Sequence, residues 1–176
     1  PSFAALARHP GPVGAPVALI AAATQAAIDE IRHSAECLRM ASAFLGRRFE
    51  LAGMPEIAGR RVAGRFWWSR QRHLVKLAVE SLLDGCLSEG NSADHLRDRA
   101  RTSVAEAVHV AERLADDEDR HTDLAWSIVA WCRATGGEAV AKALFRALDK
   151  LPWTDELTDR TRTRLSHTEL ALSGQS

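Results

Sequence analysis

A five-residue motif that occurs twice is the part of this sequence best suited to chemistry. Residues 29–33 and residues 117–121 both read Asp-Glu-x-Arg-His. Both copies lie within otherwise apolar helical patterns, where a charged side chain is costly to bury unless it is paired or bound to a metal. The acidic and imidazole groups of the two copies are therefore candidates for one shared site.

The Glu and the His of each copy are three residues apart, so they share one face of a helix. The two pairs are Glu30 with His33 and Glu118 with His121. When two such pairs lie on facing helices of a bundle, their carboxylates and imidazoles can surround a pair of metal ions. Two copies that also share the same Asp and Arg favour this dinuclear metal site, whereas a single Glu-x-x-His is common by chance.

Apolar spacing predicts that both copies lie in helices facing a core. Apolar or small residues recur at steps of three and four along residues 20–44 and along residues 104–132, and the motif Glu residues fall in these rows. The first row contains Ile20, Ala23, Ala27, Ser34, Cys37, Ala41 and Phe44. A third Glu-x-x-His, Glu106 with His109, has its His off the apolar row and is interpreted as a surface pair.

The composition predicts an all-α protein. The 176 residues include no Tyr and show no run of alternating β-branched residues. A chain of this length is sufficient for one core, so we expect residues 1–176 to form a single domain. The formal net charge of +0 predicts no general attraction to nucleic acid or membranes. Three Cys without paired spacing, no signal peptide and no membrane-spanning apolar run predict a cytoplasmic protein.

Proline and glycine residues divide the chain into predicted helices. Helices are expected at residues 2–8, 16–45, 67–98, 103–134 and 138–151, with one more after residue 154. Gly136 and Gly137 are expected to end the fourth of these. Residues 47–65 contain several Gly and are long enough to cross from one end of a bundle to the other. We therefore predict a four-helix bundle with one long crossover, extended by C-terminal helices in residues 138–176.

The third helix offers two carboxylates to a central site, Asp84 and Glu89. They lie beside an expected inner face made of Leu74, Leu77, Ala78, Ser81, Leu82, Gly85 and Ser88. Register with Glu118 across an antiparallel hairpin favours Asp84, and Glu89 lies about 7 Å further along the helix axis. Both therefore remain candidate metal ligands. Gly85 and Gly90 in mid-helix each cost about 1 kcal/mol relative to Ala, which predicts a packing or functional reason for both.

Together these features resemble the ferritin-like diiron carboxylate proteins, in which Glu-x-x-His motifs lie on alternate helices of a four-helix bundle. Within that superfamily, residues 27–33, 84–89 and 117–126 are similar to small bacterial ferritin-like domain proteins. The resemblance covers roughly residues 1–137. It implies two bound iron ions, with manganese as an alternative. The implied metal ligands are Glu30, His33, Glu118, His121 and a third-helix carboxylate.

The resemblance also implies a role for the Asp that opens each motif. Asp29 and Asp117 match acids that hydrogen-bond a ligand His; by helix facing, Asp29 would serve His121 and Asp117 would serve His33. The alternative is that both Asp are solvated and paired with the motif Arg residues. The family pattern includes one more carboxylate on the first helix. Its equivalent would precede Pro1, so we expect the first helix to be truncated.

The function implied by the resemblance is that of a non-haem diiron oxidase or oxygenase, which activates O₂ to oxidise an organic substrate. The substrate would be a small molecule, free or bound to a carrier protein, and an external donor would supply electrons. Two alternatives remain open: a ferroxidase or other iron-handling protein, and a catalytically inactive helical binding module. The absence of Tyr argues against a tyrosyl-radical role.

A basic segment bears on the choice of partners. It contains Arg47, Arg48, Arg60, Arg61, Arg65, Arg70, Arg72 and Lys76, with Phe66, Trp67 and Trp68 interleaved. Such a patch could bind an acidic carrier protein, a phosphorylated small molecule or, less favourably, RNA. The alternative is a solvated loop and helix start. A homodimer is also compatible with the sequence, and no membrane partner is expected.

Overall fold

The computed structural model describes residues 13–49, 70–101, 105–151 and 157–173, and all regular structure in these ranges is helical. The elements are α2 (Val17–Leu45), α3 (Arg70–Glu80), the π-helix η1 (Ser81–Glu89), α4 (Gly90–Ala100), α5 (Ala105–Asp149) and α6 (Asp159–Ser173). The prediction of an all-α protein is confirmed for this part of the chain. No helix within it is long and apolar enough to cross a membrane.

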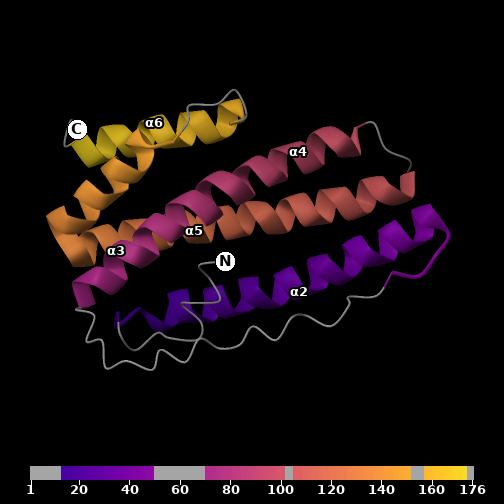
Figure 1. Ribbon diagram of the computed structural model, residues 1–176, viewed down its shortest axis with the longest axis horizontal. Helices are drawn as coiled ribbons and strands as arrows, with labels where there is room; N and C mark the ends of the chain where they lie inside the picture. The colour runs from indigo at the N-terminus through magenta and orange to yellow at the C-terminus, as the bar shows by residue number, and fades with distance from the viewer. Residues whose placement is uncertain (1–12, 50–69, 102–104, 152–156, 174–176) are drawn as a thin grey trace.

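The helices form a bundle whose central member is α5. The continuous run α3–η1–α4 packs along α5, and α2 packs against α5 as well (Figure 1). In the same view α6 lies on the far side of the bundle from α2. One connected core joins these helices, with buried members that include Ala23, Leu74, Leu82, Ile128, Cys132, Leu144 and Leu165. The C-terminal residues therefore contribute to the same core as the motif helices.

The helix that carries the first motif has the predicted bounds. Pro16 precedes its first residue, a position where the missing proline N–H costs no helical hydrogen bond. Gly46 ends it in the left-handed conformation, with φ of 61°. The predicted helix at residues 2–8 and most of the predicted crossover lie outside the described residues.

The buried face of α2 differs from the predicted row. Its buried residues are Ala23, Ala26, Asp29 and His33, whereas Ser34, Cys37 and Phe44 are exposed. A straight helix has 3.6 residues per turn, so a row spaced at 3.5 residues drifts around the helix along its length. Within the described part of the chain α2 packs mainly against α5, and the drifting row leaves that contact in its second half.

Gly137 interrupts α5 as predicted. Its φ of 58° and ψ of −142° lie in a region that is essentially restricted to glycine, and the chain continues in a second helical segment. The turn is held from α3, because the Nε2 amide of Gln71 donates a hydrogen bond to the carbonyl oxygen of Gly136 at 2.7 Å. The second segment returns Val140 and Leu144 to the core, where both are fully buried.

We expect Gly137→Ala to destabilise the protein by about 1–3 kcal/mol, because alanine would have to adopt that unfavourable backbone conformation. A Cβ at this position meets no atom within 4 Å, so the loss would come from the backbone alone. Chemical denaturation measures it. Gly46→Ala is the matched control: its Cβ also meets open space, but its conformation is ordinary left-handed helix, so a smaller loss is expected. Equal losses would contradict this reasoning.

Gly90 has a packing reason. A Cβ built on it would lie 3.3 Å from Oγ1 of Thr161 in α6 and 3.5 Å from Cγ2 of Thr122 in α5. The start of α6 is held to α4 by Thr158, which donates a hydrogen bond from Oγ1 to Asp94 at 2.6 Å and one from its backbone N–H to Asn91 at 2.8 Å. The small residue thus allows α6 to approach the junction of η1 and α4.

Candidate metal centre

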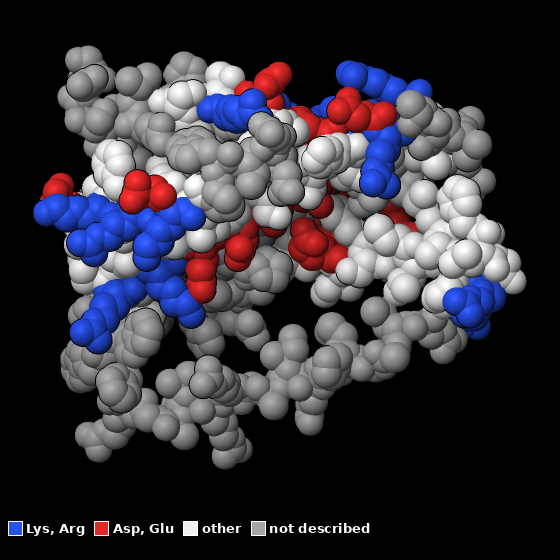
Figure 2. Space-filling view, turned by 45° about the horizontal axis from the view of Figure 1, so that its top comes forward, with Lys and Arg blue, Asp and Glu red and all other residues white. Residues whose placement is uncertain are grey.

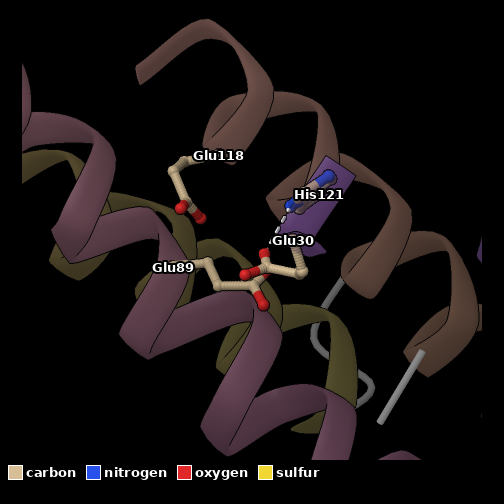
Figure 3. A group of neighbouring side chains, drawn as sticks. All are labelled: Glu30, Glu89, Glu118 and His121. Atoms are coloured by element: carbon tan, nitrogen blue, oxygen red, sulfur yellow. Dashed lines mark ion pairs between the residues drawn. The ribbon is translucent and has the colours of Figure 1, made fainter. Parts of the chain in front are cut away.

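Three helices bring acidic and imidazole side chains to one place in the bundle. Glu30 comes from α2, Glu89 from the end of η1, and Glu118 and His121 from α5 (Figure 3). One ligand atom from each of these four residues lies within 4.8 Å of the others. Carboxylate oxygens and imidazole nitrogens at such separations are donors that a metal ion could bridge.

The π-helix determines which third-helix carboxylate reaches this group. Glu89 belongs to the group, whereas Asp84 is exposed and lies outside it, so of the two predicted third-helix carboxylates the structure brings only Glu89 to the others. The hydrogen bonds of a π-helix run from i to i+5, which adds a residue to each turn and rotates the later residues around the helix axis. The buried residues of η1 are Ser81, Leu82, Gly85, Cys86 and Leu87, and they are followed by the half-buried Glu89 and the buried Gly90. The same shift leaves Ser88 exposed rather than on the inner face.

The two histidines face each other across the α2–α5 contact and are oriented by aspartates of the opposite motif. His33 Nε2 lies 2.9 Å from Asp117 Oδ2, and His121 Nε2 lies 3.5 Å from Asp29 Oδ2. The ring centroids are 5.7 Å apart. These contacts are the crossed pairing that helix facing predicted. They leave the Nδ1 atom of each ring on the side of the carboxylates.

The Nδ1 atoms approach the motif glutamates. His33 Nδ1 lies 3.6 Å from Glu118 Oε1, and His121 Nδ1 lies 3.2 Å from Glu30 Oε1. His33 is also 4.0 Å from Glu30. Each imidazole therefore has one nitrogen directed at an aspartate and the other at the glutamates, which is the arrangement expected of a ring whose second nitrogen is held by a supporting acid.

The two aspartates are buried, so the alternative of solvated side chains is wrong. Both do have the motif arginine partners that this alternative named: Arg32 contacts Asp29 and Asp117, and Arg120 contacts Asp117. Burial alone would raise the pKa of Asp117, but hydrogen bonds from His33, Arg32 and Arg120 outweigh it and lower the pKa to about 2. Asp117 is therefore an ionised acceptor at neutral pH.

The glutamates have opposing electrostatic environments. Burial, together with the charge of Glu118, raises the pKa of Glu89 to about 8. Burial and the charge of Glu30 also raise the pKa of Glu118, whereas the contact with His121 holds the pKa of Glu30 below its usual value. Three carboxylates gathered in a half-buried site repel one another when ionised. A cation among them would relieve that repulsion.

Buried polar atoms in this cluster support the same conclusion. His33 Nδ1, Glu89 Oε2 and Glu118 Oε2 are buried and make no hydrogen bond within the described part of the chain. A buried polar atom without a partner costs roughly 1–3 kcal/mol. Metal coordination would satisfy all three atoms, and an oxygen-rich donor set with imidazoles and without thiolates suits iron or manganese.

Sequence reasoning missed Gln25. Its Nε2 amide donates a hydrogen bond to Asp29 Oδ1 at 3.1 Å, one helical turn before the first motif. The i to i+4 spacing of an amide and an acid was a usable signal, because such residues are neighbours on a helix surface. Gln25 helps hold the aspartate that contacts His121.

No family model, curated protein or solved structure matches this chain. The resemblance to ferritin-like diiron proteins therefore stays a prediction. The position predicted for an extra first-helix carboxylate precedes Pro1, so no described residue tests it.

Proposed function

We propose that the protein is a ferritin-like non-haem diiron oxidase or oxygenase that uses O₂ to oxidise an organic substrate. Glu30, His33, Glu89, Glu118 and His121 would hold the two iron ions, with manganese as an alternative metal. The observation that carries the proposal is the grouping of Glu30, Glu89, Glu118 and His121, beside which His33 Nδ1 lies 3.6 Å from Glu118 Oε1. Buried atoms of His33, Glu89 and Glu118 make no hydrogen bond within the described residues. When bound, a reduced iron pair supplies the electrons for O₂ reduction.

The chain's own residues would orient and tune the ligands. Asp117 would accept a hydrogen bond from Nε2 of His33, and Asp29 would accept one from Nε2 of His121. These hydrogen bonds would fix the ring tautomers and make the Nδ1 atoms stronger metal ligands. Glu89 has a pKa of about 8, so at neutral pH without metal its carboxyl group mostly holds a proton. Metal binding at Glu89 would therefore release that proton.

The site is reachable from one face of the molecule. The Glu30 side chain is 34% exposed, whereas the His121 side chain is 3% exposed. Acidic side chains gather in the hollowed middle of one face of the molecule, between basic groups towards its two ends (Figure 2). A small ligand or metal ion would therefore reach the centre past the exposed part of Glu30, and His121 would stay shielded from bulk water.

An iron-handling role is the second candidate. It is favoured by the partial exposure of Glu30 among several carboxylates, because an open acidic entrance also suits the exchange of iron ions. The two roles differ in what happens to the iron. An oxidase keeps its two ions through many turnovers, whereas a ferroxidase passes ferric ions on.

The test is O₂ consumption by the iron-loaded protein. We would load it with Fe²⁺ without oxygen, expose it to O₂ with an added reductant, and follow O₂ and bound iron together. Repeated O₂ consumption with iron retained is expected. Accumulation of many ferric ions per chain would instead support iron handling, and no O₂ consumption above that of free Fe²⁺ would contradict both roles.

The substrate, the electron donor and a homodimer stay predictions alongside this proposal.

A further inference from the structure

We infer that Arg32 is a positioning residue that couples the two halves of the centre, an inference that rests on the proposed metal site. One nitrogen of its guanidinium, Nη2, lies 2.7 Å from Asp117 Oδ2 and 3.0 Å from Asp29 Oδ1. Asp29 and Asp117 come from different helices and belong to different motif copies. Arg32 is therefore a single cation that reaches both of the aspartates supporting the histidines.

The contacts extend from Arg32 to both imidazoles. On one side, Asp117 Oδ2 accepts from Arg32 and also lies 2.9 Å from His33 Nε2. On the other, Asp29 uses Oδ1 for Arg32 and directs Oδ2 at His121. The orientation of a supporting carboxylate fixes the ring that it holds. A change at Arg32 should therefore reach both imidazole rings, although within the described residues its guanidinium makes no hydrogen bond or ion pair to either ring.

The equivalent arginine of the second motif has different contacts. Arg120 contacts the carboxylate of Asp117 and lies 3.5 Å from the backbone oxygen of Asp116. Within the described residues no contact joins Arg120 to Asp29. The two motifs are thus alike in sequence, but only the first supplies the bridging cation, and Arg120 is a matched control for Arg32.

Both guanidinium groups lie at the surface, which makes the comparison practical. The Arg32 side chain is 53% exposed and that of Arg120 is 61% exposed, so neither substitution creates a buried cavity. Arg32→Gln removes the cation that lies between the two aspartates. Arg120→Gln removes one of several donors to Asp117, which keeps Arg32 and His33 as partners.

The first measurement uses nitrogen NMR of the imidazole rings in the metal-free full chain. We expect Arg32→Gln to shift the Nε2 signals of both His33 and His121, and Arg120→Gln to shift the His33 signal alone. Equal patterns in the two variants, or a His33 shift alone in Arg32→Gln, would overturn the inference. Because no metal is present, this result is independent of whether the proposed function holds.

The second measurement is anaerobic titration with Mn²⁺. Loss of a residue that supports metal ligands typically weakens binding by about 10–100-fold, and we expect a loss of that order at both metal positions in Arg32→Gln. Arg120→Gln should weaken binding much less. Arg32→Lys, which keeps the charge, should recover part of the affinity; a lysine variant no better than the glutamine variant would count against positioning by Arg32. If the unaltered protein binds neither Mn²⁺ nor Fe²⁺, the proposed function is contradicted. The NMR result would still decide whether Arg32 positions both histidines.

Discussion

Replacing His121 with alanine is expected to remove most of the bound metal while the helix content stays unchanged. His121 is 2% exposed, and its two ring nitrogens lie near Glu30 and Asp29. Without the imidazole, one metal position loses its nitrogen donor. Asp29 would keep Arg32 and Gln25 as partners, so its buried charge would remain compensated and the fold should persist. Elemental analysis and circular dichroism measure the two effects.

His109→Ala is the control for this experiment. His109 also follows a Glu three residues earlier, but its side chain is 79% exposed and lies near Glu112 rather than the central carboxylates. Its removal should leave metal content unchanged. If His121→Ala and His109→Ala retain the same amount of metal, His121 is not a ligand.

The second large effect is expected for Glu89→Gln, which should abolish tight metal binding and stabilise the metal-free protein. The substitution keeps the shape of the side chain but removes a negatively charged donor that belongs to the central group. Asp84→Asn is the matched control on the same helix, because Asp84 is exposed and outside the group. Calorimetric titration with Fe²⁺ or Mn²⁺ measures the metal affinity of both variants and shows whether Glu89 or Asp84 is the ligand. Loss of binding in Asp84→Asn but not in Glu89→Gln would reverse the assignment.

The stability effect has a definite sign and pH range. The pKa of Glu89 is raised from 4.5 to about 8 on folding, chiefly by burial and then by the charge of Glu118. Below pH 4.5 Glu89 is protonated in both states and costs nothing. As the pH rises towards 8, the unfolded state ionises more readily than the folded state, so the folded protein loses stability. Glutamine does not ionise. In the metal-free proteins, the melting temperature of Glu89→Gln should therefore rise relative to that of the unaltered protein as the pH increases from 5 to 8. A constant difference over this range would contradict the pKa assignment.

Several helix boundaries could be predicted from the sequence because helix ends carry local chemical signals. Pro16 and Gly46 bound α2, and Gly137 interrupts α5 through a backbone conformation that other residues avoid. The crossed pairing of Asp29 with His121 and of Asp117 with His33 also came from the repeat, since two equal motifs on facing helices must present equivalent positions to each other.

The errors came from assuming a regular helix. Axial register across an antiparallel hairpin, counted with a constant helical rise, favoured Asp84 over Glu89, whereas the chain with its nine-residue π-helix brings Glu89 to the central group. Apolar periodicity in a single sequence does not report a switch from i+4 to i+5 hydrogen bonding. The exposure of Phe44 has a related cause, since the face that α2 buries depends on which helices it contacts.

The same reasoning explains why Arg32 was not singled out. In the sequence Arg32 and Arg120 occupy the same motif position, and only the three-dimensional contacts distinguish them. Asymmetry between two copies of a motif arises from tertiary packing, which a repeat in sequence conceals.

The metal content of the protein produced in iron-supplemented medium, together with an optical spectrum before and after the reduced form meets O₂, tests the proposed diiron centre. We expect about two irons per chain, as two facing Glu-x-x-His helices imply, and an absorption change that depends on O₂. Iron and manganese at trace levels only would contradict it. The two Asp-Glu-x-Arg-His motifs would then form a buried ionic network without a metal.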